Sequence, residues 1–459
     1  MKNIILILIL SIGTYSIAQG DKSTCPTNLS IFAEYAKVKN YDSAYAPWKE
    51  VISTCPEINV ATFKYGELIL KHKIKNAAEA DQAVFKSELA GLYDSWYTHF
   101  PISKRGVNEV GNILSSKAQS MIDYDLGSRQ EAFDVFDQAF NEDPKSFKSP
   151  KRLYTYFKTS YQLYKNGTKT AEDLFNKYEE ISEKFEFEQT NLAKKLDVIL
   201  NKLDSGEPLT SREQRNKRVY ETNVYAFSTY SNNLDAIISK ESSCENLIPL
   251  YRKNFEANKS DSVWLNRAAS RMDAKECSDD PLFVELVEAL HAINPSANSA
   301  YYLGLLKDKA GDSQGALAYY EESLTLEQDQ YRKASILYKI AVKFKARGYK
   351  SKSRSYALRA LKNQPSMGKA YMLIANLYAS SANDCGNSQF EKRAVYWLAA
   401  KTARRAATVD PGTKKTALKM AVSYEGRAPS KTDIFTEGNS GETIKFSCWI
   451  NDSVTVPEL

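Results

Sequence analysis

The 459-residue sequence has few of the residues on which most catalytic and metal-binding sites depend. It has three histidines, His72, His99 and His291, which lie far apart, and it has no CxxC pair. A zinc site or a histidine-activated nucleophile requires such side chains close together. No GxxxxGK[ST] or GxGxxG stretch occurs, so there is no phosphate-binding loop of these types. We therefore expect a non-enzymatic protein without a metal or a cofactor.

A strong charge of one sign is also absent. The chain has 62 basic and 56 acidic residues, a formal net charge of +6. Lysine and glutamate alternate along most predicted helices, a pattern typical of solvated helix faces. Nucleic-acid binding would require a concentrated basic surface. We therefore expect no nucleic-acid partner.

Long apolar runs are missing except at the start of the chain. Lys2 precedes the apolar run Ile4–Ile12, and Ser16-Ile17-Ala18 then places small residues two positions apart. This pattern predicts a secretory signal peptide over residues 1–18, cleaved after Ala18. A membrane anchor would need a longer run, and no later stretch could cross a bilayer. The mature chain is therefore expected to be exported and not to be an integral membrane protein.

Two segments between Ala297 and Pro411 share one pattern of small and large residues, with equivalent positions 37 residues apart, as Gly304 and Ala341 are. Small residues stand where two helices must approach closely, and a glycine or proline ends each unit. The first segment is marked by Ala300, Leu303, Gly304, Lys307, Gly311, Ala316 and Tyr320, and the second by Leu337, Ile340, Ala341, Phe344, Gly348, Ser353, Ala357, Ala360 and Pro365. The pattern resembles the tetratricopeptide (TPR) repeat, and it predicts an all-α solenoid of helical hairpins.

The remaining periodicity divides the chain into five parts. They are the signal peptide (1–18), N-terminal TPR-like hairpins (19–165), a long central hairpin (166–240), a C-terminal array with a capping helix at 413–424 (241–424), and a tail (425–459). In the tail, residues 443–449 and 453–456 are typical of strands, so we expect a small β-hairpin there. A lone hairpin is marginal in water, and a covalent link to the array would stabilise it.

The central hairpin is predicted from residues 170–203 and 211–238, which show helical spacing on either side of a turn at Asp204–Pro208. Leu192, Leu196, Ile199 and Leu203 follow the 4, 3, 4 spacing of a coiled-coil seam. Two arrangements remain open at this point: a paddle that projects from the solenoid, or two long helices packed as ordinary repeats.

Six cysteines fit an exported protein, because disulfides persist in oxidising compartments. Six cysteines allow fifteen pairings. The predicted hairpins favour Cys25–Cys55, since the first residue opens a helix and the second closes its partner. They also favour Cys244–Cys277, which precede the second helices of successive repeats, and this leaves Cys385–Cys448.

Two surfaces are candidates for partner binding. One is the groove face of the first helices in the C-terminal array, where tyrosines beside lysines suit an extended peptide; the residues are Tyr301, Lys307, Tyr338, Lys345, Tyr371 and Asn376. The other is the basic cluster Arg212, Arg215 and Arg218 at the hairpin turn, which could meet acidic lipid headgroups or an acidic protein. The alternatives are that these tyrosines belong to the core and that the arginines are a solvated face.

Several runs resemble an exported TPR family of Bacteroidota over nearly the whole mature chain. They are Trp48 to Cys55-Pro56, Leu373 to Ser381 before Cys385-Gly386, Lys392 to Trp397, and Cys448-Trp449-Ile450 with Thr455-Val456. The resemblance implies an all-helical solenoid in the periplasm or cell envelope, and it supplies no established activity. We therefore expect a scaffold for other envelope proteins. The alternatives are an assembly chaperone for secreted or outer-membrane clients and an enzyme acting on cell-wall glycan through acidic residues.

Overall fold

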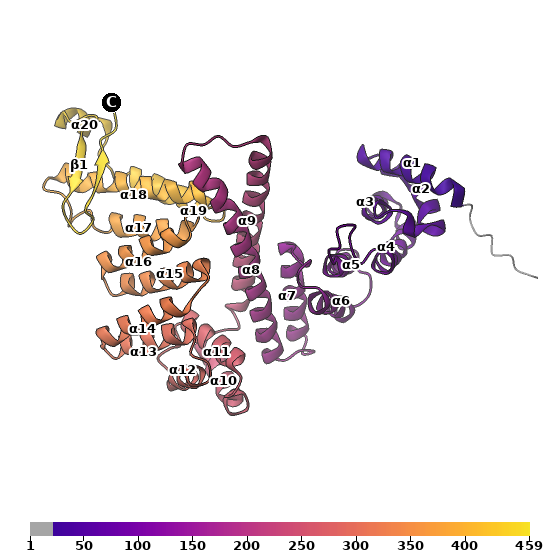
Figure 1. Ribbon diagram of the computed structural model, residues 1–459, viewed down its shortest axis with the longest axis horizontal. Coiled ribbons are helices and arrows are strands. Elements are labelled where there is room, and N and C mark those ends of the chain that lie inside the picture. The colour runs from indigo at the N-terminus through magenta and orange to yellow at the C-terminus, as the bar shows by residue number, and fades with distance from the viewer. Residues whose placement is uncertain (1–21) are drawn as a thin grey trace, which may run out of the picture. The chain divides into compact units, whose positions relative to one another are not determined.

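The computed structural model describes residues 22–459, so the predicted signal peptide lies outside the described part. The chain forms two compact units, Met1–Leu163 and Tyr164–Leu459, which are treated separately below. The described residues form twenty α-helices, two short 3₁₀ helices and one two-stranded sheet, which confirms the predicted all-α fold (Figure 1). No helix among residues 22–459 combines the length and the apolar character needed to cross a bilayer.

The N-terminal unit is a series of helical hairpins. Its helices are α1 (Cys25–Lys37), α2 (Tyr41–Thr54), α3 (Ala61–Asn76), α4 (Glu79–His99), α5 (Val110–Tyr124), α6 (Arg129–Glu142) and α7 (Pro150–Lys165), with 3₁₀ turns η1 (Lys22–Thr24) and η2 (Pro56–Ile58). Trp48 is at the centre of the first hairpins: it is buried, and its indole Nε1 donates a 2.8 Å hydrogen bond to the backbone oxygen of Thr62. The ring lies against Gly66, where a side chain would not fit.

The C-terminal unit contains the long hairpin, the repeats and the tail. Its helices are α8 (Ala171–Asp204), α9 (Ser211–Ile238), α10 (Cys244–Asn258), α11 (Ser262–Ala274), α12 (Pro281–Ile293), α13 (Ala297–Lys309), α14 (Ser313–Leu326), α15 (Gln330–Ala346), α16 (Lys350–Asn363), α17 (Gly368–Ala379), α18 (Gln389–Val409), α19 (Lys414–Glu425) and α20 (Lys431–Glu437). We call α11–α18 the C-terminal array.

The small residues of the predicted repeats lie at helix contacts in the array. A Cβ atom at Gly304 would be 2.6 Å from the ring of Tyr320, so α13 and α14 touch there without a side chain between them. At the equivalent place in the next repeat, buried Ser353 donates a 2.7 Å hydrogen bond to the backbone oxygen of Ala341. The positions that define the pattern are therefore the positions that set the spacing of each hairpin.

The long hairpin packs on the array and does not project from it. Thr170 with Asp173 and Thr210 with Glu213 form capping boxes that fix the starts of α8 and α9. The buried residues Leu196 and Leu200 of α8 contact Val409 of the array. The leucines predicted as a coiled-coil seam thus serve partly to attach α8 to the array, because a long apolar stripe is buried by whichever surface is available.

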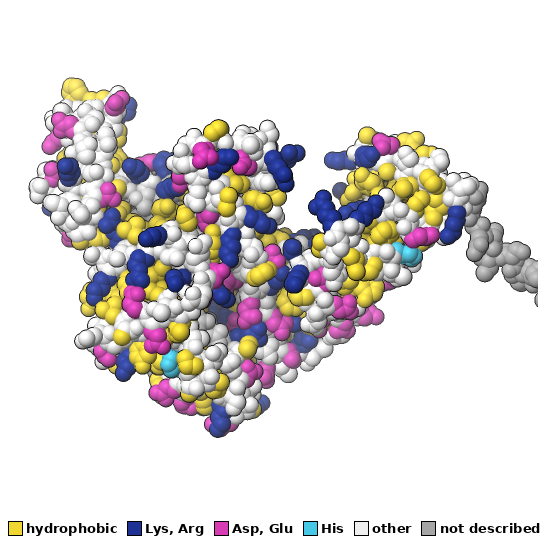
Figure 2. All heavy atoms as spheres, viewed as in Figure 1, with side chains coloured by type: hydrophobic (Ala, Val, Ile, Leu, Met, Phe, Trp, Pro, Cys, Tyr) yellow, Lys and Arg dark blue, Asp and Glu magenta, His cyan; other side chains and the backbone are white. Residues whose placement is uncertain are grey.

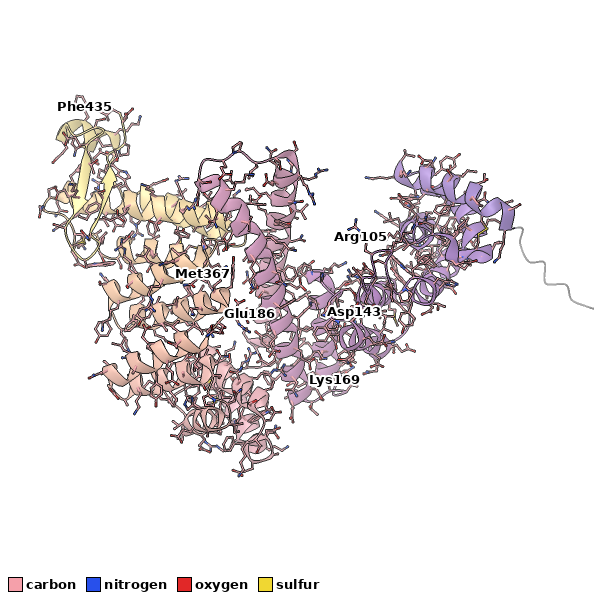
Figure 3. The ribbon with its side chains drawn as sticks, viewed as in Figure 1. Arg105, Asp143, Lys169, Glu186, Met367 and Phe435 are labelled. Atoms are coloured by element: carbon pink, nitrogen blue, oxygen red, sulfur yellow. A yellow bond between two sulfur atoms is a disulfide. The ribbon has the colours of Figure 1, made fainter. Side chains whose placement is uncertain are left out.

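The tail holds one helix that the sequence did not predict, α20, before strands β1 (Thr443–Phe446) and β2 (Asp452–Thr455), which pair antiparallel. In α20 only Ile434 is buried, and it packs with Phe390 and Val456. The next residue, Phe435, is 75% exposed and points away from the unit (Figure 3). Seven residues with one apolar contact give no measurable periodicity, although the Ser430–Asp433 capping box was a signal that could have found the helix.

The six cysteines lie in the three pairs that the sequence predicts. The Cα–Cα distances are 6.5 Å for Cys25–Cys55, 5.5 Å for Cys244–Cys277 and 5.5 Å for Cys385–Cys448, all within the range of disulfides. The third bridge ties the β-hairpin to the segment between α17 and α18, as expected for a two-stranded element with little core of its own.

Peptide mapping of the unreduced protein should recover these three pairs. In the double variant C385S/C448S, we expect amide exchange in Thr443–Thr455 to speed up while α15 and α16 stay protected, because removing a bridge typically costs about 2–4 kcal/mol and here the loss is local. Unchanged protection of both strands in that variant would mean that noncovalent packing alone holds the tail.

Candidate protein-binding cleft

Two arginines of α11 hold the first half of α8. Arg271 Nε donates to Glu179 Oε1 at 3.0 Å, and its guanidinium stacks 3.9 Å from the ring centre of Tyr178. One turn away, Arg267 binds Glu183 through two hydrogen bonds of 2.8 Å. Burial raises the pKa of the Glu179 carboxyl, although Arg271 opposes that rise. The pair of Arg271 and Glu179 is therefore a buried ion pair in which each charge depends on the other.

The second half of α8 is held farther along the array. Lys194 Nζ lies 2.8 Å from Asp329 Oδ2, in the turn before α15. The hydroxyl of Tyr331 donates a 2.8 Å hydrogen bond to buried Asp197, and desolvation raises the pKa of that carboxyl. The helix α8 is therefore attached to the array near Glu179 and again near Lys194. Between these two places a space separates it from the array.

Between these attachment points, α8 and the array enclose a cleft of about 1060 Å³. It is larger than most small-molecule pockets and is lined mainly by polar side chains. On α8 the lining includes Glu179, Glu183, Glu186, Thr190, Asn191 and Lys194, and on the array it includes Asn266, Arg267, Ser270, Arg271, Asn298, Asp329, Arg332, Ser335 and Lys339. Figure 2 shows acidic and basic side chains similarly intermixed on the visible surface of this unit.

Most charges in the cleft are paired with each other, but a few polar groups remain. Glu186 extends from α8 into the space beside the array (Figure 3), and neither it nor Lys339 forms an ion pair with another described residue. The Lys339 ammonium lies 5.6 Å from the ring centre of Tyr301. The buried hydroxyl of Ser182, also in the wall, has no hydrogen-bond partner among residues 22–459. Glu186 and Lys339 are therefore the charged groups available to a ligand.

Lys369, at the start of α17, lies near Lys339. Part of its side chain is exposed, but its ammonium is 4.7 Å from the ring centre of Tyr338. Desolvation lowers the pKa of Lys369, and repulsion by Lys339 lowers it further, while Glu186 acts in the opposite direction. Lys339 and Lys369 therefore place two positive charges close together, and the carboxylate of Glu186 balances them only in part.

Comparison with known proteins agrees with the repeat architecture. No family model matches the chain. Over 112 residues it is 30% identical to photosystem I assembly protein Ycf3 of Cuscuta gronovii, an alignment covering 22% of this chain and 67% of that TPR protein. Ycf3 of Prochlorococcus marinus (strain MIT 9303) is 30% identical over 130 residues, which cover 26% of this chain and 75% of that protein. This chain belongs to the TPR proteins.

Solved TPR structures superpose only loosely on the chain. A tetratricopeptide repeat protein from Parabacteroides merdae ATCC 43184 is 12% identical, with a TM-score of 0.24 over 68% of this chain and 97% of that one. Yeast Tom70 is 10% identical, with a TM-score of 0.25 over 88% and 90%.

Within the TPR array, the tyrosines predicted to face a partner do not form one surface. Tyr301 is only 1% exposed and packs against Tyr302 and Tyr320, so it is a core residue. Tyr338 and Tyr371 are half-buried, and Tyr371 packs against α8 beside Leu196. The physical reasons differ: α8 covers Tyr371, whereas Tyr301 is buried among neighbouring rings of the repeats themselves.

The other predicted residues have separate surroundings. Lys307 and Lys345 are exposed and lie outside the cleft lining, and Asn376 is half-buried near Tyr424. Arg212, Arg215 and Arg218 are exposed on α9.

The sequence analysis missed the cleft itself. The signal lay in two matching charge patterns: glutamates at 179, 183 and 186 on one face of α8, and arginines four residues apart, at 267 and 271, on α11.

Proposed function

We propose that the protein is an exported, non-enzymatic TPR scaffold that holds other envelope proteins in the periplasm, and that the cleft between α8 and the array is its binding site. The main support for this proposal is the cleft. It is large and lined by many polar side chains, and ion pairs hold its two walls together at both ends. A rigid site of this kind suits a partner segment bound in an extended form.

The chemistry of the lining favours a polypeptide segment. An extended chain presents an amide donor and a carbonyl acceptor at every residue, and these groups must be satisfied when they are buried. Asn191 and Thr190 offer such partners in the wall, while Glu186 and Lys339 offer one charge of each sign. Neither cofactor nor metal is needed for this role.

The same lining supports binding in preference to catalysis. An acid–base enzyme needs carboxyl groups free to exchange protons. Glu179 and Glu183 are instead held by arginines, and Lys194 holds Asp329. Glu186 remains as a single carboxylate opposite a lysine, which is the arrangement of a recognition site.

The sequence supports the proposed compartment. The apolar run Ile4–Ile12 with its small-residue site supports export, and three cysteine pairs support an oxidising space. The resemblance of several runs to an exported TPR family of Bacteroidota supports the periplasm.

The role is tested by chemical crosslinking of the tagged protein in cells, capture from envelope fractions and mass spectrometry of the crosslinked peptides. We expect one or two dominant protein partners. Many weakly captured clients would indicate an assembly chaperone instead, and retention on cell-wall glycan without a protein partner would indicate a wall-acting protein. A protein recovered alone after gentle crosslinking would contradict the scaffold.

A further inference from the structure

The outward side of α9 carries a set of cations and apolar side chains that is separate from the cleft. Arg212, Arg215 and Arg218 are exposed, as are Val219 and Tyr225, at 52% and 58%. At about 100° per residue, these five positions fall within an arc of about 140° around the helix. We call them the basic face of α9.

The arginines of the basic face keep their charge unbalanced. None of the three forms an ion pair with a described residue, whereas the acidic side chains around them are already engaged. These pairs are Glu213 with Lys202, Glu221 with Lys217, and Asp204 with Arg405. One exposed carboxylate remains, Glu207, which accepts a hydrogen bond from Ser205 in the turn. The surface near the turn is therefore positive.

We infer that the basic face of α9 contacts the anionic surface of a lipid bilayer. Guanidinium groups bind phosphate oxygens through paired hydrogen bonds, so three exposed arginines match phospholipid headgroups. Val219 and Tyr225 lie among them, and apolar and aromatic side chains of this kind enter the headgroup region when a helix lies on a membrane.

An acidic protein is the competing partner for such a surface. The basic face lies on the outward side of a helix at the turn end of a hairpin, and none of the described cleft lining comes from it. A helix face that has no pocket can lie flat on a planar bilayer. Specific protein partners, in contrast, usually insert side chains into well-packed pockets. The mixture of cations and exposed apolar groups therefore favours lipid.

The test uses the disulfide-intact protein without residues 1–18, sedimented with vesicles of equal parts phosphatidylglycerol and phosphatidylcholine. We expect binding to these vesicles, little binding to pure phosphatidylcholine, and weaker binding at high salt. Each arginine near an anionic surface is worth about fivefold in partitioning, so R212Q/R215Q/R218Q should bind about a hundredfold more weakly. V219S should also weaken binding, without a change in charge.

The matched control removes three exposed lysines of the N-terminal unit, in the variant K75Q/K145Q/K148Q, which has the same loss of charge. Binding that falls equally in both triple variants, or in neither, would overturn the inference. The inference would also be overturned if the wild-type protein did not bind anionic vesicles but crosslinked through α9 to an acidic protein. Neither result affects the cleft, because the basic face contributes no residue to it.

Discussion

Replacing Arg271 by alanine is expected to lower the free energy of unfolding of the C-terminal unit by about 3–5 kcal/mol, the usual effect of removing one member of a buried ion pair. Only 6% of the Arg271 side chain is exposed, and the variant would leave the Glu179 carboxylate buried without its counter-charge. The loss also removes the stacking on Tyr178. Amide exchange should accelerate in α8 and α11, since this pair joins the two helices.

The pH dependence of this variant has a definite sign. Burial already raises the pKa of Glu179, and the loss of Arg271 should raise it further. A carboxyl group whose pKa is higher in the folded than in the unfolded protein binds more protons when folded, so stability rises as the pH falls. The deficit of R271A should therefore be smaller at pH 5 than at pH 8.

Arg252→Ala is the matched control for Arg271→Ala. Arg252 contacts two carboxylates, Glu285 and Asp280, but unlike Arg271 it is exposed. Exposed ion pairs contribute little to stability. Urea unfolding of the two variants followed by circular dichroism should separate them clearly. Equal effects of R271A and R252A would show that α8 is not held to α11 by the buried pair.

The second large effect is expected at Gly66 in the N-terminal unit. A Cβ atom at this position would be 2.5 Å from Nε1 of Trp48, a ring that is buried and hydrogen-bonded to Thr62. The ring cannot move without losing that bond, so Gly66→Ala should destabilise the unit by about 1–3 kcal/mol, as overpacked cores do. We expect this steric cost to exceed the gain in helix propensity that alanine normally brings.

Gly91→Ala provides a control of opposite sign. Gly91 is also inside a helix, α4, but it is exposed, and a Cβ atom there would meet nothing within 4 Å. Alanine should therefore stabilise α4 by up to about 1 kcal/mol. Thermal unfolding followed by fluorescence of the N-terminal tryptophans would compare the two variants. If G66A melts at or above the temperature of G91A, the close contact of α3 with Trp48 is not as described.

Much of the helical framework could be predicted because its signals are local. Residues 211–238 were expected as a helix, and α9 spans the same residues, since a turn precedes it and Thr210 caps it. Gly304 and Ala341 marked the repeats because helices that cross closely need small side chains. The helix α20 was not predicted, because seven residues are too few to show a helical period of apolar residues.

The candidate site was harder to predict because its parts are distant in sequence. Glu179 and Arg271 are 92 residues apart, and nothing near either residue indicates the other. A long amphipathic helix shows that it must bury one face, but not which surface will cover it. The position of α8 answers a question left open by the sequence, because the hairpin packs on the array and Tyr371 lies against Leu196 instead of a partner. The same position creates the cleft.

The central claim, that a partner segment lies in the cleft between α8 and the array, is tested most directly by site-specific photo-crosslinking. A benzoylphenylalanine at Asn191 would report from the cleft wall, and one at Lys345 from an exposed site outside it on α15. Both proteins would be irradiated in cells and isolated from the envelope. The account predicts that position 191 captures one dominant protein, through a short peptide, and that position 345 does not capture it. Capture of the same protein from position 345 alone would contradict the account.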